Sequence, residues 1–143
     1  MNDYETDVLA WSERQAALLR RLAAGERVND RDLDWPNIAE EIQDAGLSSL
    51  RAFRSLLIQV LAHEMKAAAW PASVHAARWR HDAGNFRLDA REVFTPSMRQ
   101  KIDLAAIYRR ALRELPPEID GCKPLPLPAV CPATLDELIA GDG

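Results

Sequence analysis

The chain has 143 residues, of which 48% are hydrophobic and 28% are charged, and its formal net charge is −4. This length supports one buried core in a single domain over residues 1–143. The acidic balance argues against proteins that coat nucleic acids through a strongly basic surface. Two cysteines, Cys122 and Cys131, are too few for a disulfide framework. With no apolar signal segment in the acidic N-terminal stretch, we expect a cytoplasmic protein with reduced thiols.

The first periodic segment, residues 4–24, predicts an amphipathic helix. Its apolar face carries Tyr4, Val8, Trp11, Leu18, Leu19 and Leu22, with Gln15 as the polar member of the row. Gly25 stands where a C-terminal cap glycine is expected, and a polar loop follows. Asp34, followed by Trp35 and Pro36, marks the start of a second helix over about residues 35–45. This second helix is expected to bury Trp35, Ile38, Ala39, Ile42 and Ala45.

The most apolar window, residues 50–70, predicts the central helix of a bundle, since apolar residues cover most of its circumference. We expect Gly46 to stop or bend the second helix, and Ser48 or Ser49 to cap the central one. Charged side chains within the window, among them Arg51 and Arg54, argue against a membrane span.

Pro71 is expected to end the central helix. A fourth helix is predicted over about residues 72–93 and a fifth over about 97–114, the latter capped at Thr95 to Ser97. Residues 116–132 contain alternating prolines and predict an extended strap. A short last helix begins at Thr134. The sequence therefore predicts an all-α fold: a single-domain bundle of five to six helices with a proline-rich C-terminal strap.

Five charged or titratable side chains near these apolar faces form a candidate polar cluster: Glu40, Glu41, His63, Glu64 and Lys66. Glu64 projects into the apolar face of the central helix, so it must be paired, be hydrogen-bonded or take up a proton. One interpretation is a structural ion pair. The other is a site in which Glu41 and His63 act as an acid–base pair. No metal or other cofactor is predicted, because the chain lacks the Glu-x-x-His spacing of di-iron bundles and the clustered ligands of zinc sites.

Charge is distributed unevenly along the chain. Residues 1–45 contain five basic and eleven acidic side chains, whereas residues 78–113 contain nine basic and four acidic ones. In one interpretation the acidic ends fold back over the basic middle. In the other, seven arginines form an anion-binding face: Arg78, Arg80, Arg87, Arg91, Arg109, Arg110 and Arg113. Few aromatic residues accompany them, so nucleic-acid binding by base stacking is not favoured.

Several motifs together resemble domain-of-unknown-function family 29, a group of small bacterial proteins. They are Asp7, Trp11 and Gln15; Asp34-Trp35-x-Asn37-x-x-Glu40-Glu41-Ile42; Gly46; Leu61-Ala62-His63-x-x-Lys66; Trp79; Thr95-Pro96-Ser97-Met98; and Cys131-Pro132-x-Thr134-Leu135. The resemblance implies an all-helical fold and a bacterial source, and it supplies no activity. It also implies that Glu41, His63 and Lys66 hold residue types shared by the family, whereas Glu64 departs from an apolar position. If the second and central helices meet, they would bring Glu40 or Glu41 near His63 and Lys66.

Three hypotheses about function follow. The leading one is a non-enzymatic protein-interaction module with an unknown protein partner or a second copy of itself, in which the buried Glu/His/Lys cluster fixes helix register. The second is binding of an anion or nucleic acid through residues 78–113. The third is an enzyme that uses Glu41 and His63.

Overall fold

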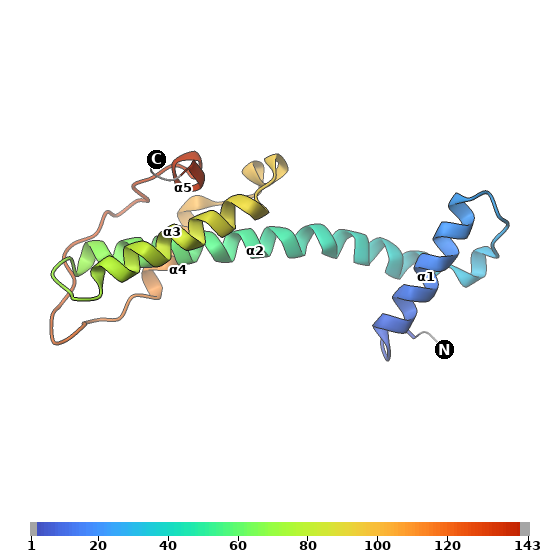
Figure 1. Ribbon diagram of the computed structural model, residues 1–143, viewed down its shortest axis with the longest axis horizontal. Coiled ribbons are helices and arrows are strands. Elements are labelled where there is room, and N and C mark those ends of the chain that lie inside the picture. The colour runs from blue at the N-terminus through green and yellow to red at the C-terminus, as the bar shows by residue number, and fades with distance from the viewer. Residues whose placement is uncertain (1–2, 141–143) are drawn as a thin grey trace. The chain divides into compact units, whose positions relative to one another are not determined.

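A computed structural model describes residues 3–140 of the chain, and these residues are all-helical, with five α-helices and two short 3-10 helices (Figure 1). The contacts divide the chain into two compact units, Met1–Leu47 and Ser48–Gly143, here called unit 1 and unit 2. Each unit has its own cluster of buried apolar side chains. Within the described part, no helix combines the length and the apolar character needed to cross a bilayer.

Unit 1 is built on α1 (Val8–Ala23), which begins later than the predicted start at residue 4 and ends at the predicted cap glycine, Gly25. Asp7 precedes the helix, and its carboxylate accepts a hydrogen bond from the backbone N–H of Ala10 at 3.0 Å. Gly25 has a φ of +85°, which a glycine adopts without strain. Its N–H donates to the Leu22 carbonyl, and that of Glu26 donates to the Arg21 carbonyl. These two bonds form the Schellman motif that satisfies the last carbonyls of a helix.

The second and central helices of the sequence analysis are one continuous helix, α2 (Trp35–Ala69), so the predicted break at Gly46 and the cap at Ser48 or Ser49 are wrong. A glycine inside a helix costs about 1 kcal/mol relative to alanine. That cost is too small to end a helix whose neighbouring residues all favour it. The C-terminal end is close to the prediction, because α2 stops at Ala69 and Pro71 lies in the turn that follows.

The predicted burial along the first turns of α2 is also wrong, except at Ile38. Ile38 is buried with Trp11 and Leu33 in the core of unit 1. Trp35 and Ile42 are 42% and 70% exposed, and Ala39 and Ala45 are exposed as well. This face was expected to pack against a separate central helix. Because both predicted helices are parts of α2, that packing does not occur.

Unit 2 packs around the second half of α2, as the apolar window predicts. Phe53, Leu57, Val60 and Leu61 are fully buried there. After the turn at Pro71, α3 (Ala76–Val93) runs back along this half of α2 (Figure 1). Helices α4 (Leu104–Arg113) and α5 (Leu135–Ala140) complete the core.

The predicted fifth helix is divided in two. Residues Pro96–Gln100 form a 3-10 helix, and α4 begins only at Leu104. The reason lies at Asp103, whose carboxylate accepts a hydrogen bond from the N–H of Ala106 at 3.1 Å. An aspartate in an N-cap position starts a new helix, because it satisfies one of the free N–H groups of the first turn.

The segment between α4 and α5 contains no α-helix in the described chain and is held by backbone atoms at several points. The indole N–H of Trp70 donates to the carbonyl of Cys122 at 2.8 Å, and the N–H of Leu125 donates to the carbonyl of Ala69 at 2.9 Å. The hydroxyl of Tyr108 donates to the carbonyl of Pro128 at 2.6 Å. These bonds tie a proline-rich stretch, which cannot form its own regular hydrogen bonds, to the helices of unit 2.

Candidate functional site

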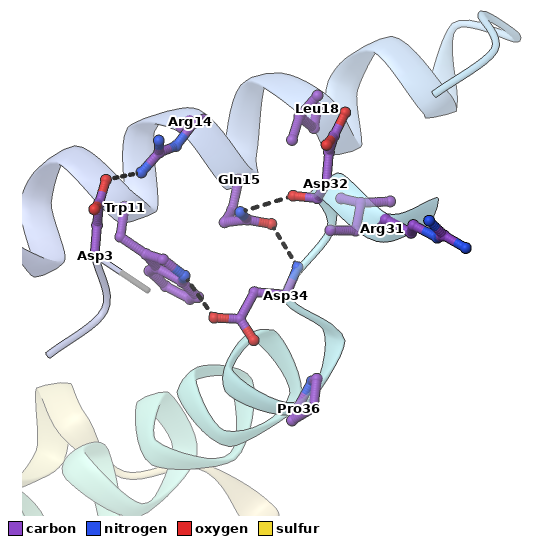
Figure 2. Close-up of a pocket in the computed structure, with 10 residues that line it drawn as sticks. Asp3, Trp11, Arg14, Gln15, Leu18, Arg31, Asp32, Asp34 and Pro36 are labelled. Carbon is purple, nitrogen blue, oxygen red and sulfur yellow. Dashed lines mark hydrogen bonds and ion pairs between the residues drawn. The ribbon is translucent and has the colours of Figure 1, made fainter. Parts of the chain in front are cut away.

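A hollow of about 570 Å³ opens in unit 1 between α1, the loop after it and the start of α2 (Figure 2). Its charged lining residues carry both signs: Asp3, Arg14, Arg31, Asp32 and Asp34. Arg14 forms an ion pair with Asp3 across one side of the hollow, whereas Figure 2 shows Arg31 extending outward from the loop. The polar lining makes this hollow the first place to look for chemistry.

Gln15 holds the loop against α1. Its Oε1 accepts a hydrogen bond from the backbone N–H of Asp34 at 2.9 Å, and its Nε2 donates to the carbonyl of Asp32 at 3.1 Å (Figure 2). The side chain is buried, and a buried amide is tolerated only when its hydrogen bonds are made. Gln15, the polar residue in the apolar row of the first helix, therefore fixes the backbone of the following loop against α1.

Asp34 and Glu41 fix α1 to the start of α2. The Oδ2 of Asp34 accepts hydrogen bonds from the indole N–H of Trp11 at 2.9 Å and from Nδ2 of Asn37 at 2.8 Å. The hydroxyl of Tyr4 donates to Oε1 of Glu41 at 2.6 Å, and the ring of Tyr4 meets that of Trp11 edge-on, with centroids 4.8 Å apart. Five motif residues, Trp11, Gln15, Asp34, Asn37 and Glu41, are thus joined with Tyr4 in one network.

This network positions helices and contains no serine, cysteine or histidine that could serve as a nucleophile. In the described residues, every buried side-chain nitrogen and oxygen has a hydrogen-bond partner. No group of three or more His, Cys, Asp or Glu side chains between residues 3 and 140 is arranged to hold a metal ion. Both cysteines are free: Cys122 is exposed, and burial raises the pKa of the half-buried Cys131 thiol, which disfavours its thiolate.

The hydrogen bond to Glu41 is the main reason why the pKa of Tyr4 rises from 10.0 to about 12, with smaller contributions from burial and from the carboxylate charge. A raised pKa means that the folded state favours the protonated phenol. The hydrogen bond between Tyr4 and Glu41 therefore contributes its full stabilisation of the folded state below pH 10, and this contribution is lost as the pH rises through about 12.

We expect Glu41→Gln to lower the pKa of Tyr4 toward its ordinary value, because a neutral amide no longer favours the protonated hydroxyl. The measurement is an alkaline titration of the tyrosine Cζ resonances by ¹³C NMR. Glu40→Gln is the matched control, since Glu40 is exposed and contributes only through its charge. An unchanged Tyr4 pKa in Glu41→Gln would contradict the assigned hydrogen bond.

The five residues of the candidate polar cluster do not meet at one point. Glu40 and Glu41 belong to unit 1, whereas His63, Glu64 and Lys66 belong to unit 2. All five lie on α2, so the expected approach of two separate helices does not occur. The acid–base pair of Glu41 and His63 gains no support, because Glu41 accepts the hydrogen bond of Tyr4.

The three residues of this set in unit 2 each have a different neighbour, and all three are half-buried. His63 Nδ1 lies 2.7 Å from the carbonyl of Gln59, and its ring packs against Phe86. Glu64 forms an ion pair with Arg87 of α3, which is the first of the three alternatives that its position on the apolar face allows. The Nζ of Lys66 lies 5.4 Å from the centroid of the Trp79 ring, a cation–π contact.

The seven arginines of the predicted anion-binding face divide between α3 and α4. Two of them hold the last helix: Arg87 Nε donates to the Leu138 carbonyl at 2.8 Å, and Arg91 Nε donates to the Ile139 carbonyl at 2.7 Å. Helices end with unpaired carbonyls and a partial negative charge, so arginines are suitable partners there. Arg80 lines a cavity with Glu64 and Arg87. The remaining four are exposed: Arg78, Arg109, Arg110 and Arg113. Two of these form weak ion pairs along their own helices, Arg78 with Asp82 and Arg110 with Glu114.

The comparison with known proteins gives a family and a solved relative, both without an established activity. No curated protein matches the chain significantly. A crystal structure of an α-helical protein of unknown function from Rhodospirillum rubrum matches with a TM-score of 0.67 and 32% sequence identity, covering 97% of this chain and 90% of that one. The domain of unknown function DUF29 matches residues 4–142, which span both units. The chain therefore belongs to the DUF29 family.

Proposed function

We propose that this chain is a cytoplasmic bacterial protein-interaction module and that unit 1 docks its partner through a partly exposed apolar strip on α2. The docking strip consists of Trp35, Ala39 and Ile42, which are spaced by four and three residues and therefore lie on one face of the helix. Apolar residues at this spacing are typical of a helix face that packs against another element.

The exposure of Ile42 is the observation that carries this proposal. Its side chain is 70% exposed, although it lies on the same periodic stripe that is fully buried at Phe53 and Val60 in unit 2. Covering a side chain of this size contributes about 1.5–3 kcal/mol. A partner that covers Ile42 and Trp35 would recover this free energy.

The small core of unit 1 is consistent with this role. Among its described residues, the buried apolar side chains are Trp11, Leu33 and Ile38. A segment of this length buries a low fraction of its surface by itself, and such units are commonly stabilised by association. The polar network around Gln15 keeps α1 in place and leaves the strip free for a partner.

The charges beside the strip define the chemistry of that partner. Glu40 and Asp44 are exposed on α2, and residues 1–45 contain eleven acidic side chains against five basic ones. The partner surface we expect is an amphipathic helix with lysines or arginines beside its apolar face.

The test begins with a photo-crosslinking residue at position 42 of the full chain in its native cells, and the captured protein is then purified. Its dissociation constant is measured by calorimetry with the wild-type chain and two variants. Ile42→Asp should weaken binding by at least about tenfold, since it removes an apolar contact and places a carboxylate in an apolar interface that would desolvate it. Leu88→Asp is the matched control, because Leu88 is 54% exposed on α3, and it should change binding by less than about twofold.

Two results would overturn the proposal: equal losses for both variants, or a captured protein that does not bind the purified chain. If the captured protein is a second copy of this chain, sedimentation equilibrium should show a dimer that Ile42→Asp dissociates.

A further inference from the structure

Another cavity, of about 430 Å³, lies within unit 2 between α2 and α3. Its lining residues are Glu64, Ala67, Ala68, Pro71, Arg80 and Arg87. Two guanidinium groups and one carboxylate therefore share a small hollow whose remaining lining is alanine and proline.

Arg87 is held in a fixed orientation at this cavity. It forms the ion pair with Glu64, and its Nε donates to the carbonyl of Leu138 at 2.8 Å. A guanidinium has five N–H donors in a rigid plane, so these two interactions leave further donors for a ligand. The side chain is 17% exposed, which places its positive charge in a region of reduced solvent screening.

Arg80 lies seven residues before Arg87, two helical turns away on the same face of α3. Its side chain is exposed, and no ion pair joins it to any residue between 3 and 140. The charged lining of the cavity is thus two guanidinium groups and one carboxylate, which gives the lining a net charge of +1.

We propose that this cavity binds a small organic anion with one carboxylate or phosphate group and a compact apolar body. Arg80 and the spare donors of Arg87 hold the oxyanion through charge-assisted hydrogen bonds, which planar guanidinium groups make in pairs. Ala67, Ala68 and Pro71 contact the apolar part of the ligand. The volume lies within the range of small-molecule sites.

The experiment measures binding of benzoate, phenyl phosphate and inorganic phosphate to the full chain by calorimetry at constant ionic strength. Arg80→Gln should weaken the affinity for the probe that binds by about tenfold or more, because it removes a charged hydrogen-bond donor. Arg78→Gln is the matched control: Arg78 is exposed on the same helix, pairs with Asp82 at 4.0 Å and does not line the cavity. It should change the dissociation constant by less than about twofold.

A cavity-filling variant, Ala68→Phe, provides the second test. Ala68 is exposed, so the fold should tolerate the larger ring while the apolar part of the cavity is lost. Ala68→Phe should abolish benzoate and phenyl phosphate binding, with the melting temperature of the free protein unchanged. Preference for phenyl phosphate over benzoate would identify a phosphate ligand, and the reverse a carboxylate. Absence of binding by all three probes, or equal losses for Arg80→Gln and Arg78→Gln, would overturn the site.

Discussion

Replacing Leu57 by alanine is expected to lower the free energy of unfolding by about 2–5 kcal/mol. Leu57 is fully buried in the core of unit 2, where side chains from α3, α4 and α5 surround α2. The substitution removes apolar contacts and leaves a cavity that the four helices cannot close completely. Urea unfolding followed by circular dichroism measures the change.

Leu88→Ala is the control for this prediction, because Leu88 is 54% exposed on α3. We expect a change within about 0.5 kcal/mol for this variant. If Leu57→Ala and Leu88→Ala gave similar changes, the assignment of α2 as the centre of the unit 2 core would be wrong.

Replacing Arg87 by alanine is the second change with a large expected effect, a loss of about 2–4 kcal/mol. It removes the partner of Glu64, whose side chain is 28% exposed, and the donor to the Leu138 carbonyl at the end of α5. A carboxylate left half-buried without its cation is destabilising, and a helix end without its donor frays. Relative to the wild-type chain, hydrogen exchange in Arg87→Ala should therefore accelerate more in α5 than in α4.

A double-mutant cycle separates the ion pair from the contact with α5. Glu64→Gln alone should cost less than Arg87→Ala, because Arg87 keeps its hydrogen bond to Leu138. The double variant should lose less stability than the sum of the losses in the two single variants. Fully additive losses would show that Glu64 and Arg87 do not interact.

Local features of the fold follow directly from the sequence. The cap glycine at Gly25 depends on residues within one helical turn of it and occurs as predicted, whereas the N-cap at Asp7 was not predicted, because the expected helix began at residue 4. The apolar period of residues 50–70 likewise identifies the core helix of unit 2. The DUF29 resemblance also holds over residues 4–142.

The errors arise where two local signals compete, and the gaps arise where a residue's partners are distant in the chain. Gly46 has a modest cost that its helical neighbours overcome, so α2 is continuous. Asp103 divides a predicted helix because a side-chain cap competes with helix continuation, a local signal that the apolar period concealed. Gln15 was recognisable as a polar residue in an apolar row, but its partners at Asp32 and Asp34 required the structure.

The sequence by itself determined that the chain is all-helical, that Gly25 ends the first helix, and that Glu64 must be paired, be hydrogen-bonded or take up a proton. These properties depend on helical period, on backbone preferences and on the cost of an unpaired carboxylate in an apolar environment. Only the tertiary structure decided that Arg87 pairs with Glu64, that Trp35 and Ile42 remain uncovered, and that Arg80 and Arg87 line one cavity. Pairing between residues far apart in the chain depends on how helices pack, which the local pattern of any one helix does not specify.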